Sequence, residues 1–256
     1  MTMQTTGLTV DVVRAQPARF RHPLLLLHGL WTGNWIWRDL AAHLANRGWE
    51  AWLPALLRED FAPSLDERVH ELTEMCRSMS APPVIVAHDA AMITARTLAR
   101  DLPAPAIVAI APRVPVARGR LGLLLDPCLR GAALFAARVP PPGPPHVLLA
   151  GIEAHVAQLR PDSGAFVRAA CGSVARAVDG PAGLVLVGRR DPAVDTAAAE
   201  RLARTLAWSC DVHETAGHFP MIGRDSERLA DRLHRWIVRA TGQDMLLWDE
   251  ESEDDG

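Results

Sequence analysis

Cysteine is scarce in this chain of 256 residues, and long uninterrupted apolar runs are lacking. Its four cysteines, Cys76, Cys128, Cys171 and Cys210, lie far apart and form neither a C-x-x-C motif nor a cluster with histidines. This spacing argues against a metal site and against a disulfide framework. No apolar run approaches the roughly 18 residues that a membrane span needs, and no basic-then-apolar segment opens the chain. We therefore expect a cytoplasmic protein without metal or cofactor.

Tyrosine is absent altogether, and positive charge is not in excess, since the net charge is −3. The charge balance gives no reason to expect nucleic acid as a partner. Apolar residues make up 49% and charged residues 22% of the chain, as in an ordinary soluble globular protein. The length allows one large domain with a sizeable core. Alanine, arginine and proline are abundant and lysine is not, a composition typical of a GC-rich bacterial genome.

Short apolar runs alternate along the chain with segments of helical spacing. The continuous apolar runs are typical of strands covered on both faces, as in parallel sheets. Alternation of this kind predicts an α/β fold, with a mostly parallel central sheet and helices on both faces. The expected strands lie at 8–13, 23–27, 49–53, 84–88, 106–111, 183–187 and 211–214, and the expected helices at 35–47, 66–79, 90–101, 195–207 and 226–241.

The alternation stops in the middle of the chain. A proline-rich stretch at 139–145, which cannot be helical inside, separates segments with helical patterns. We interpret the region as a small helical cap inserted into the core. The predicted parts are a core of 1–112 and 181–243, a cap of 113–180 with helical patterns at 118–138, 146–159 and 163–178, and an acidic, disordered tail of 244–256.

The first part of this cap is rich in arginine. A solvated helix face would account for these side chains. They could also attract an anionic substrate or a carrier protein. The arginines are Arg113, Arg118, Arg120, Arg130 and Arg138, against the single acid Asp126.

The apolar run at 84–88 leads into a tight corner and then a helical pattern. This is the outline of a strand–nucleophile–helix elbow, which in its G-x-S-x-G form carries a serine at the tip. Here Asp89 stands at the tip, and Ala87, Ala90 and Ala91 stand around it. Because Cβ atoms crowd a sharp turn that glycine would allow, a catalytically inactive binding relative also remains open.

Two further strand ends carry catalytic residue types. Asp191 follows the strand at 183–187, and His218 follows the strand at 211–214. Ligands bind beyond the carboxyl ends of the strands in such sheets, so these residues and Asp89 are expected around one pocket, with His28. His218 would be the general base, and Asp191 would fix its tautomer, with Asp195 as a competing candidate for that acid.

The order nucleophile, acid, histidine resembles that of the α/β-hydrolase superfamily, and the resemblance covers nearly the whole chain. The stretch His28–Trp37 is similar to the H-G-x-x-x-G-x-W-x-W stretch of small esterases and hydroxynitrile lyases, and residues 216–220 look like their histidine loop. The resemblance implies an oxyanion hole made by the backbone N–H groups of Leu30 and Ala90. Trp31 and Phe219 are further candidates for the lining of the substrate pocket, with packing in the core as the alternative for Trp31.

An aspartate at the elbow resembles haloalkane dehalogenases and epoxide hydrolases, where the carboxylate attacks carbon and forms an ester. Dehalogenases bind the halide with a tryptophan after the nucleophile and a polar residue after His-Gly, where this chain has Ala90 and Leu30. Relatives that act on fluoroacetate use arginines beside the nucleophile, where this chain has Ala91 and Met92. Epoxide opening needs cap tyrosines, and this chain has none. These differences argue against both haloalkane dehalogenation and epoxide hydrolysis.

Two interpretations of Asp89 as part of an enzyme site remain. In the first, Asp89 is a nucleophile toward a small activated ester, lactone or similar electrophile, and His218 activates the hydrolytic water. In the second, Asp89 and His218 act as acid and base in a lyase or cyclase reaction, such as elimination of acetate or ring closure in specialised-metabolite biosynthesis. In either case the expected partner is a small molecule, and an anionic one if the arginines of the cap serve to attract it.

Overall fold

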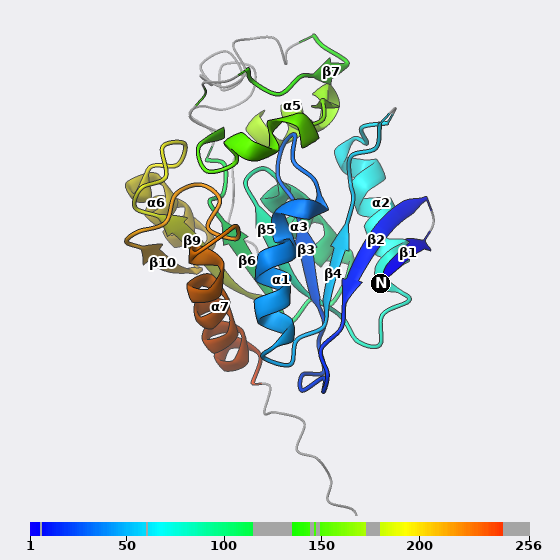
Figure 1. Cartoon of the computed structure of the whole chain (residues 1–256), viewed down its shortest axis with the longest axis vertical. Helices are drawn as coiled ribbons and strands as arrows, with labels where there is room; N and C mark the ends of the chain where they lie inside the picture. Colours follow the sequence, from blue (N-terminus) through cyan, green and yellow to red (C-terminus); the bar gives the residue numbers. More distant parts are fainter. Residues whose placement is uncertain are drawn as a thin grey trace, which may run out of the picture.

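The computed structural model describes residues 1–5, 7–59, 61–114, 135–143, 146, 149–172 and 180–242. An eight-stranded sheet lies at its centre, in the order β1-β2-β4-β3-β5-β6-β9-β10 (Figure 1). β1, β2 and β4 pair antiparallel, and the pairs from β4 to β10 are parallel. The predicted, mostly parallel sheet is thus confirmed. Its strands are β1 (Thr2–Thr5), β2 (Leu8–Val13), β3 (Leu24–Leu27), β4 (Ala51–Pro54), β5 (Val84–His88), β6 (Ala106–Ile110), β9 (Ala182–Gly188) and β10 (Ser209–His213).

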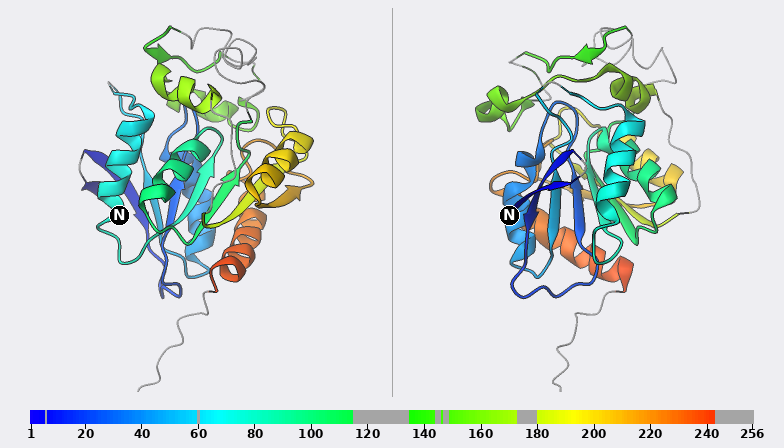
Figure 2. Two further views of the ribbon diagram at one scale, coloured as in Figure 1. Left: turned by 180° about the vertical axis from the view of Figure 1, so that it is seen from behind. Right: turned by 90° about the vertical axis from the view of Figure 1, so that its right-hand side faces the viewer.

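Helices cover both faces of the sheet, as predicted (Figures 1 and 2). α1 (Arg38–Ala45) and α7 (Asp225–Thr241) pack together on one face. α2 (Leu65–Cys76), α3 (Ala91–Asp101) and α6 (Thr196–Leu206) lie on the other. None of the described helices combines the length and the apolar character that crossing a membrane requires.

The leucine run of β3 shows why the sheet is covered on both sides. All four leucines of the strand are fully buried. Leu24 and Leu26 pack in the apolar cluster that contains the buried face of α1, whereas Leu25 and Leu27 pack in the cluster under α2 and α3. Successive side chains of a strand point to opposite faces, so a run without polar residues needs cover on both.

The inserted segment lies over the carboxyl edge of the sheet (Figure 1). Its described part holds a 3₁₀ helix (Glu153–Gln158), a helix α5 (Gly164–Gly172), and a two-stranded ribbon of β7 (Arg138–Val139) and β8 (Asp162–Ser163). The boundaries 113–180 that we predict for a cap remain a prediction.

Two helix predictions in this segment are wrong in part. Within the described part of the expected helix 146–159, the chain forms the 3₁₀ helix Glu153–Gln158 in place of an α-helix, because Gly151 adopts φ 93°, outside the helical region. Arg138, expected at the end of a helix, lies in β7 instead. Residues 115–134, with Arg118, Arg120 and Arg130, lie outside the described residues, as does the predicted tail 244–256.

The helix predicted at 35–47 also differs, since a 3₁₀ turn (Asn34–Trp37) precedes α1 and the helix ends at Ala45.

Candidate active site

Asp89 stands at a sharp corner between β5 and α3, in the left-handed region with φ 51°. A non-glycine residue there stores strain that the surrounding structure must offset. The Asp89 N–H donates to the Ile110 carbonyl of the neighbouring strand β6, over 3.0 Å. Gly29 passes so close that a Cβ on it would lie 2.8 Å from the Asp89 Cβ. The elbow therefore forms with alanines around the tip, and the glycine that the corner requires is on the adjacent loop.

Hydrogen bonds hold both oxygens of the Asp89 carboxylate. Oδ2 accepts from the Leu30 backbone N–H over 3.3 Å, and Oδ1 accepts from Nε of Arg113 over 3.1 Å. Burial by itself would raise the pKa of Asp89. Arg113 and His218, helped by a hydrogen bond from the Ala90 backbone, outweigh it, so this pKa lies below its ordinary value. Asp89 is thus a buried carboxylate that stays ionised.

Arg113 has a different place from the one expected of a charged cap residue. Its side chain is 9% exposed and forms an ion pair with Asp89, so it is not part of a solvated face. The signal was present in the sequence, because Arg113 comes three residues after β6, the strand next to β5. Carboxyl ends of neighbouring parallel strands meet at one edge of the sheet. The position of Arg113 points to Asp89 only once β6 is known to lie beside β5.

His218 and Asp191 come together across the loops that follow β10 and β9. Nδ1 of His218 lies 2.9 Å from Oδ2 of Asp191, and both side chains are buried. The other oxygen, Oδ1, accepts from the backbone N–H groups of Ala193 and Val194. A carboxylate on Nδ1 leaves Nε2 of the ring available as a base. Asp195, the competing candidate, instead caps α6 by accepting from the Ala198 N–H.

His88, the last residue of β5, supports the histidine loop. Its Nε2 donates to the His218 carbonyl over 3.0 Å, and the centres of the His88 and His218 rings are 4.8 Å apart. Burial, aided by the charge of His218, lowers the pKa of His88 to about 4, so the ring is neutral at physiological pH. No hydrogen bond joins the Asp89 carboxylate to His218 in the part of the chain that the structure describes.

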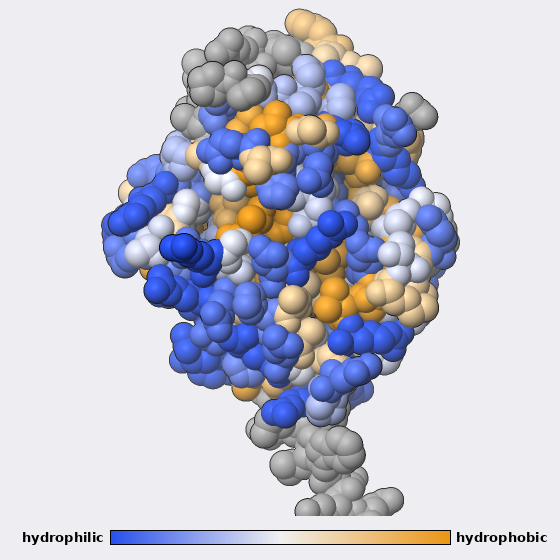
Figure 3. Space-filling view, viewed as in Figure 1, coloured by the Kyte–Doolittle hydropathy of each residue, from blue (hydrophilic) through white to orange (hydrophobic). Residues whose placement is uncertain are grey.

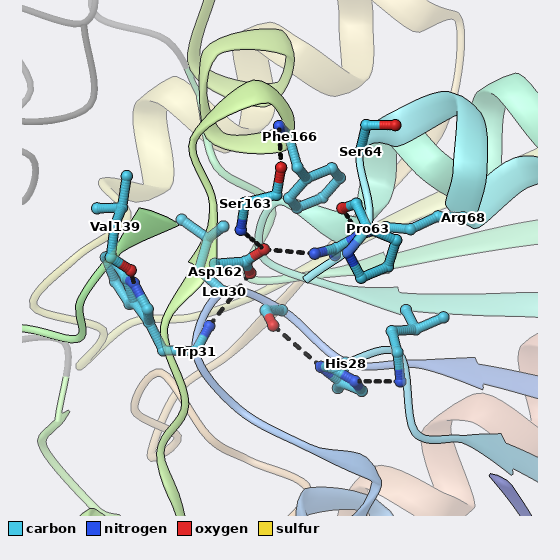
Figure 4. Close-up of polar contacts among 12 residues, drawn as sticks. His28, Leu30, Trp31, Pro63, Ser64, Arg68, Val139, Asp162, Ser163 and Phe166 are labelled. Carbon is cyan, nitrogen blue, oxygen red and sulfur yellow. Dashed lines mark hydrogen bonds and ion pairs between the residues drawn. The ribbon is translucent and has the colours of Figure 1, made fainter. Parts of the chain in front are cut away.

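The structure does not bring His28 to the pocket. Its Nε2 accepts from the Leu56 N–H over 3.0 Å, and its Nδ1 lies 3.1 Å from the Gly29 carbonyl (Figure 4). Burial lowers the pKa of His28 to about 3. A neutral ring in this position joins the loop after β3 to the loop after β4, which is a structural task.

A small cavity of about 10 Å³ lies between the elbow and the inserted segment, with room for a single water molecule. Figure 3 shows apolar side chains gathered where the inserted segment meets the core. The cavity brings together the predicted residues Leu30, Trp31, Asp89, His218 and Phe219. It is also lined by Thr32, His88, Leu149, Ile152 and Leu159. Among the described residues no group of three or more His, Cys, Asp or Glu side chains is arranged to hold a metal ion.

Residues 24–232 match the model of the Alpha/beta hydrolase family. The fold is also similar to that of solved hydrolases. The esterase from Thermogutta terrifontis has 16% identity, with 94% of this chain and 98% of that chain covered and a TM-score of 0.61. The monoglyceride lipase from Saccharomyces cerevisiae has 14% identity, with coverage of 94% and 95% and a TM-score of 0.69. The monoacylglycerol lipase from Paleococcus ferrophilus has 16% identity, with coverage of 91% and 99% and a TM-score of 0.69. The search of curated proteins gave no match.

Proposed function

Because the chain belongs to the alpha/beta hydrolase family, and is thus an enzyme of the hydrolase superfamily, we propose that it hydrolyses a small electrophile such as a strained lactone or an activated ester. The reaction passes through a covalent ester on Asp89. One observation carries the proposal: the Leu30 N–H, predicted to be an oxyanion donor, donates to Asp89 Oδ2. The oxyanion donor therefore binds the side-chain carboxylate of Asp89, and not an oxygen of the substrate.

In the first step Asp89 Oδ1 attacks the saturated carbon that bears the leaving oxygen of the substrate. The bond between that carbon and the leaving oxygen breaks, and an alkyl ester forms on Asp89. The lowered pKa keeps Asp89 ionised and available as the nucleophile. Arg113, which pairs with Oδ1 at rest, moves to the anion that is released. A leaving carboxylate suits the guanidinium best, and this supports an anionic product or substrate.

In the second step His218 takes a proton from a water molecule, which attacks Cγ of the Asp89 ester. Negative charge then develops on Oδ2, where the Leu30 N–H already donates. Collapse breaks the bond between Cγ and Oδ1, His218 returns its proton to Oδ1, and the alkyl group leaves as an alcohol, while the acid left on Asp89 loses its proton to solvent. Asp191 stabilises the imidazolium that forms on His218. Asp89 returns to a carboxylate that holds one oxygen from water.

β-Propiolactone is a suitable probe, because a carboxylate opens its ring at the CH₂ carbon and releases a carboxylate. His218→Gln should accumulate an adduct on the peptide that contains Asp89, whereas Asp89→Asn should show no adduct there. In water enriched in oxygen-18, the wild-type enzyme should carry label in Asp89 after several turnovers. Product formed without label in Asp89, and with no adduct in His218→Gln, would sink the proposal in favour of elimination or ring closure. Turnover that neither substitution changes would point to a binding relative instead.

A further inference from the structure

Trp31 follows the proposed oxyanion donor Leu30 and is tied to the inserted segment by three hydrogen bonds. Its N–H donates to Asp162 Oδ2 over 3.4 Å, and its carbonyl accepts from the Arg160 N–H over 2.9 Å. Its indole Nε1 donates to the Val139 carbonyl over 3.0 Å (Figure 4). Trp31 has φ 60°, so the loop carries strain at the residue after the donor Leu30 and needs outside contacts to hold it.

Asp162 is the side chain among these contacts, and Arg68 of α2 fixes it. The two form an ion pair through Asp162 Oδ1, and both side chains are 0% exposed. The same oxygen accepts from the Ser163 N–H over 2.7 Å. Arg68 is held in turn, since its Nε donates to the Pro63 carbonyl over 3.1 Å and its guanidinium lies 3.5 Å from the centre of the Phe166 ring.

This network connects elements that are far apart in the sequence. Figure 4 shows Arg68 and Phe166 on one side of Asp162, with Trp31 on the other. A buried ion pair is weak evidence for stability, because well-packed apolar residues can replace it at little cost. What the pair supplies and apolar residues cannot is an acceptor directed at the Trp31 N–H.

We propose that Asp162, held by Arg68, is a positioning residue that fixes the Leu30 N–H on Asp89 through the backbone of Trp31. The inference rests on the proposed function in one respect, namely that the Leu30 N–H is the oxyanion donor. It follows that the site is competent only while β8 is packed against the loop after β3. Displacement of the inserted segment releases the donor.

Two double variants test the proposal. Arg68→Met with Asp162→Asn removes both charges and keeps an oxygen for the Trp31 N–H. Arg68→Met with Asp162→Leu removes both charges and the acceptor. With β-propiolactone as the probe, we expect the leucine variant to lose about 10–100-fold in kcat with KM within about threefold, because a misplaced donor costs less than the 10²–10³-fold of a deleted one. The asparagine variant should recover most of that loss.

Hydrogen exchange of the Leu30 amide gives a readout that needs no turnover. It should be about tenfold or more faster in the leucine variant than in the asparagine variant, at equal thermal midpoints. Equal exchange and equal kcat in the two variants would overturn the proposal and leave a purely structural pair. If leucine prevents folding, Asp162→Ala in the same background provides the comparison. Failure of the proposed function shows separately, as the absence of an Asp89 adduct.

Discussion

Two arginine–aspartate pairs are buried within the described part of the chain, and they differ in what surrounds the carboxylate. Asp162 and Arg68 are fully enclosed between α2, β8 and α5, and burial raises the pKa of Asp162 above its ordinary value. Asp89 borders the cavity, and although burial opposes it, Arg113 holds the pKa of Asp89 below its ordinary value. The same two residue types thus serve different purposes. An enclosed pair orients its neighbours, whereas a pair at a cavity wall keeps a charge available for reaction.

Removing the nucleophilic carboxylate should give the largest effect. We expect Asp89→Asn to lose about 10⁴-fold or more in kcat/KM on β-propiolactone, an increase of about 5.5 kcal/mol in the barrier. Steady-state hydrolysis measures it. Asp195→Asn makes the same replacement of a carboxylate by an amide at an exposed helix cap, and it should retain activity within about twofold. Comparable losses in both variants would contradict the assignment of Asp89.

Breaking the enclosed pair of Arg68 and Asp162 should give the next largest effect, which is a loss of stability. Arg68→Met leaves Asp162 as an uncompensated buried charge, so we expect the free energy of unfolding to fall by about 3–5 kcal/mol. Urea denaturation measures it. Arg113→Met is the matched control, and it should cost less than about half as much, because Asp89 keeps its hydrogen bond from Leu30 and borders the cavity. Equal losses would remove the distinction between the two pairs.

Arg113→Met, the variant expected to cost less stability than Arg68→Met, should nevertheless reduce the rate of catalysis more than Arg68→Met does. Without the guanidinium, burial dominates at Asp89, its pKa rises, and the anion that acts as nucleophile is lost at a higher pH. We expect kcat/KM to fall about 10–100-fold at neutral pH, with the acid limb of the pH–rate profile moved to higher pH. An unmoved acid limb would show that Arg113 does not set the ionisation of Asp89.

The smallest effect concerns two neutral buried histidines, His28 and His88. The pKa of His28 is lowered to about 3 and that of His88 to about 4, so below about pH 6.5 the unfolded chain binds protons that the folded protein does not. Stability present at neutral pH should therefore fall as the pH is lowered, by up to about 1.4 kcal/mol per pH unit for each histidine. Urea denaturation at pH 7, 6 and 5 measures the slope, and His28→Gln should reduce it. An unchanged slope in His28→Gln would contradict a neutral His28.

The elements that position the site were accessible from pattern alone. The apolar runs of β3 and β5 have no polar face, so they predict central strands, and their ends place Leu30 and Asp89 at one edge. β1 escaped prediction because Thr2–Thr5 has no apolar run and pairs only at the sheet border. The choice between Asp191 and Asp195 as the partner of His218 could only be weighed, because both follow β9 and only packing shows which reaches the ring.

The contacts of the inserted segment could not be derived in this way. The pair of Arg68 and Asp162 joins residues 94 positions apart, and no periodicity links them. Arg113 was noticed as a charge and assigned to a cap, because its partner depends on which strand lies beside β5. His28 was placed at the pocket because it follows the end of a strand, whereas its ring lies against the loop after β4.

The sequence by itself determined the parallel sheet, the elbow with its aspartate, and the order of acid and histidine, because strand and helix periods and strand ends are local properties of the chain. Only the tertiary structure decided what holds Asp89. The donors Leu30 and Arg113 come from two different strand ends, and their meeting at one carboxylate depends on strand order, burial and the loop that Trp31 ties to the inserted segment. Charge in a protein interior is set by such neighbours, since they determine both the desolvation and the compensating partners of each group.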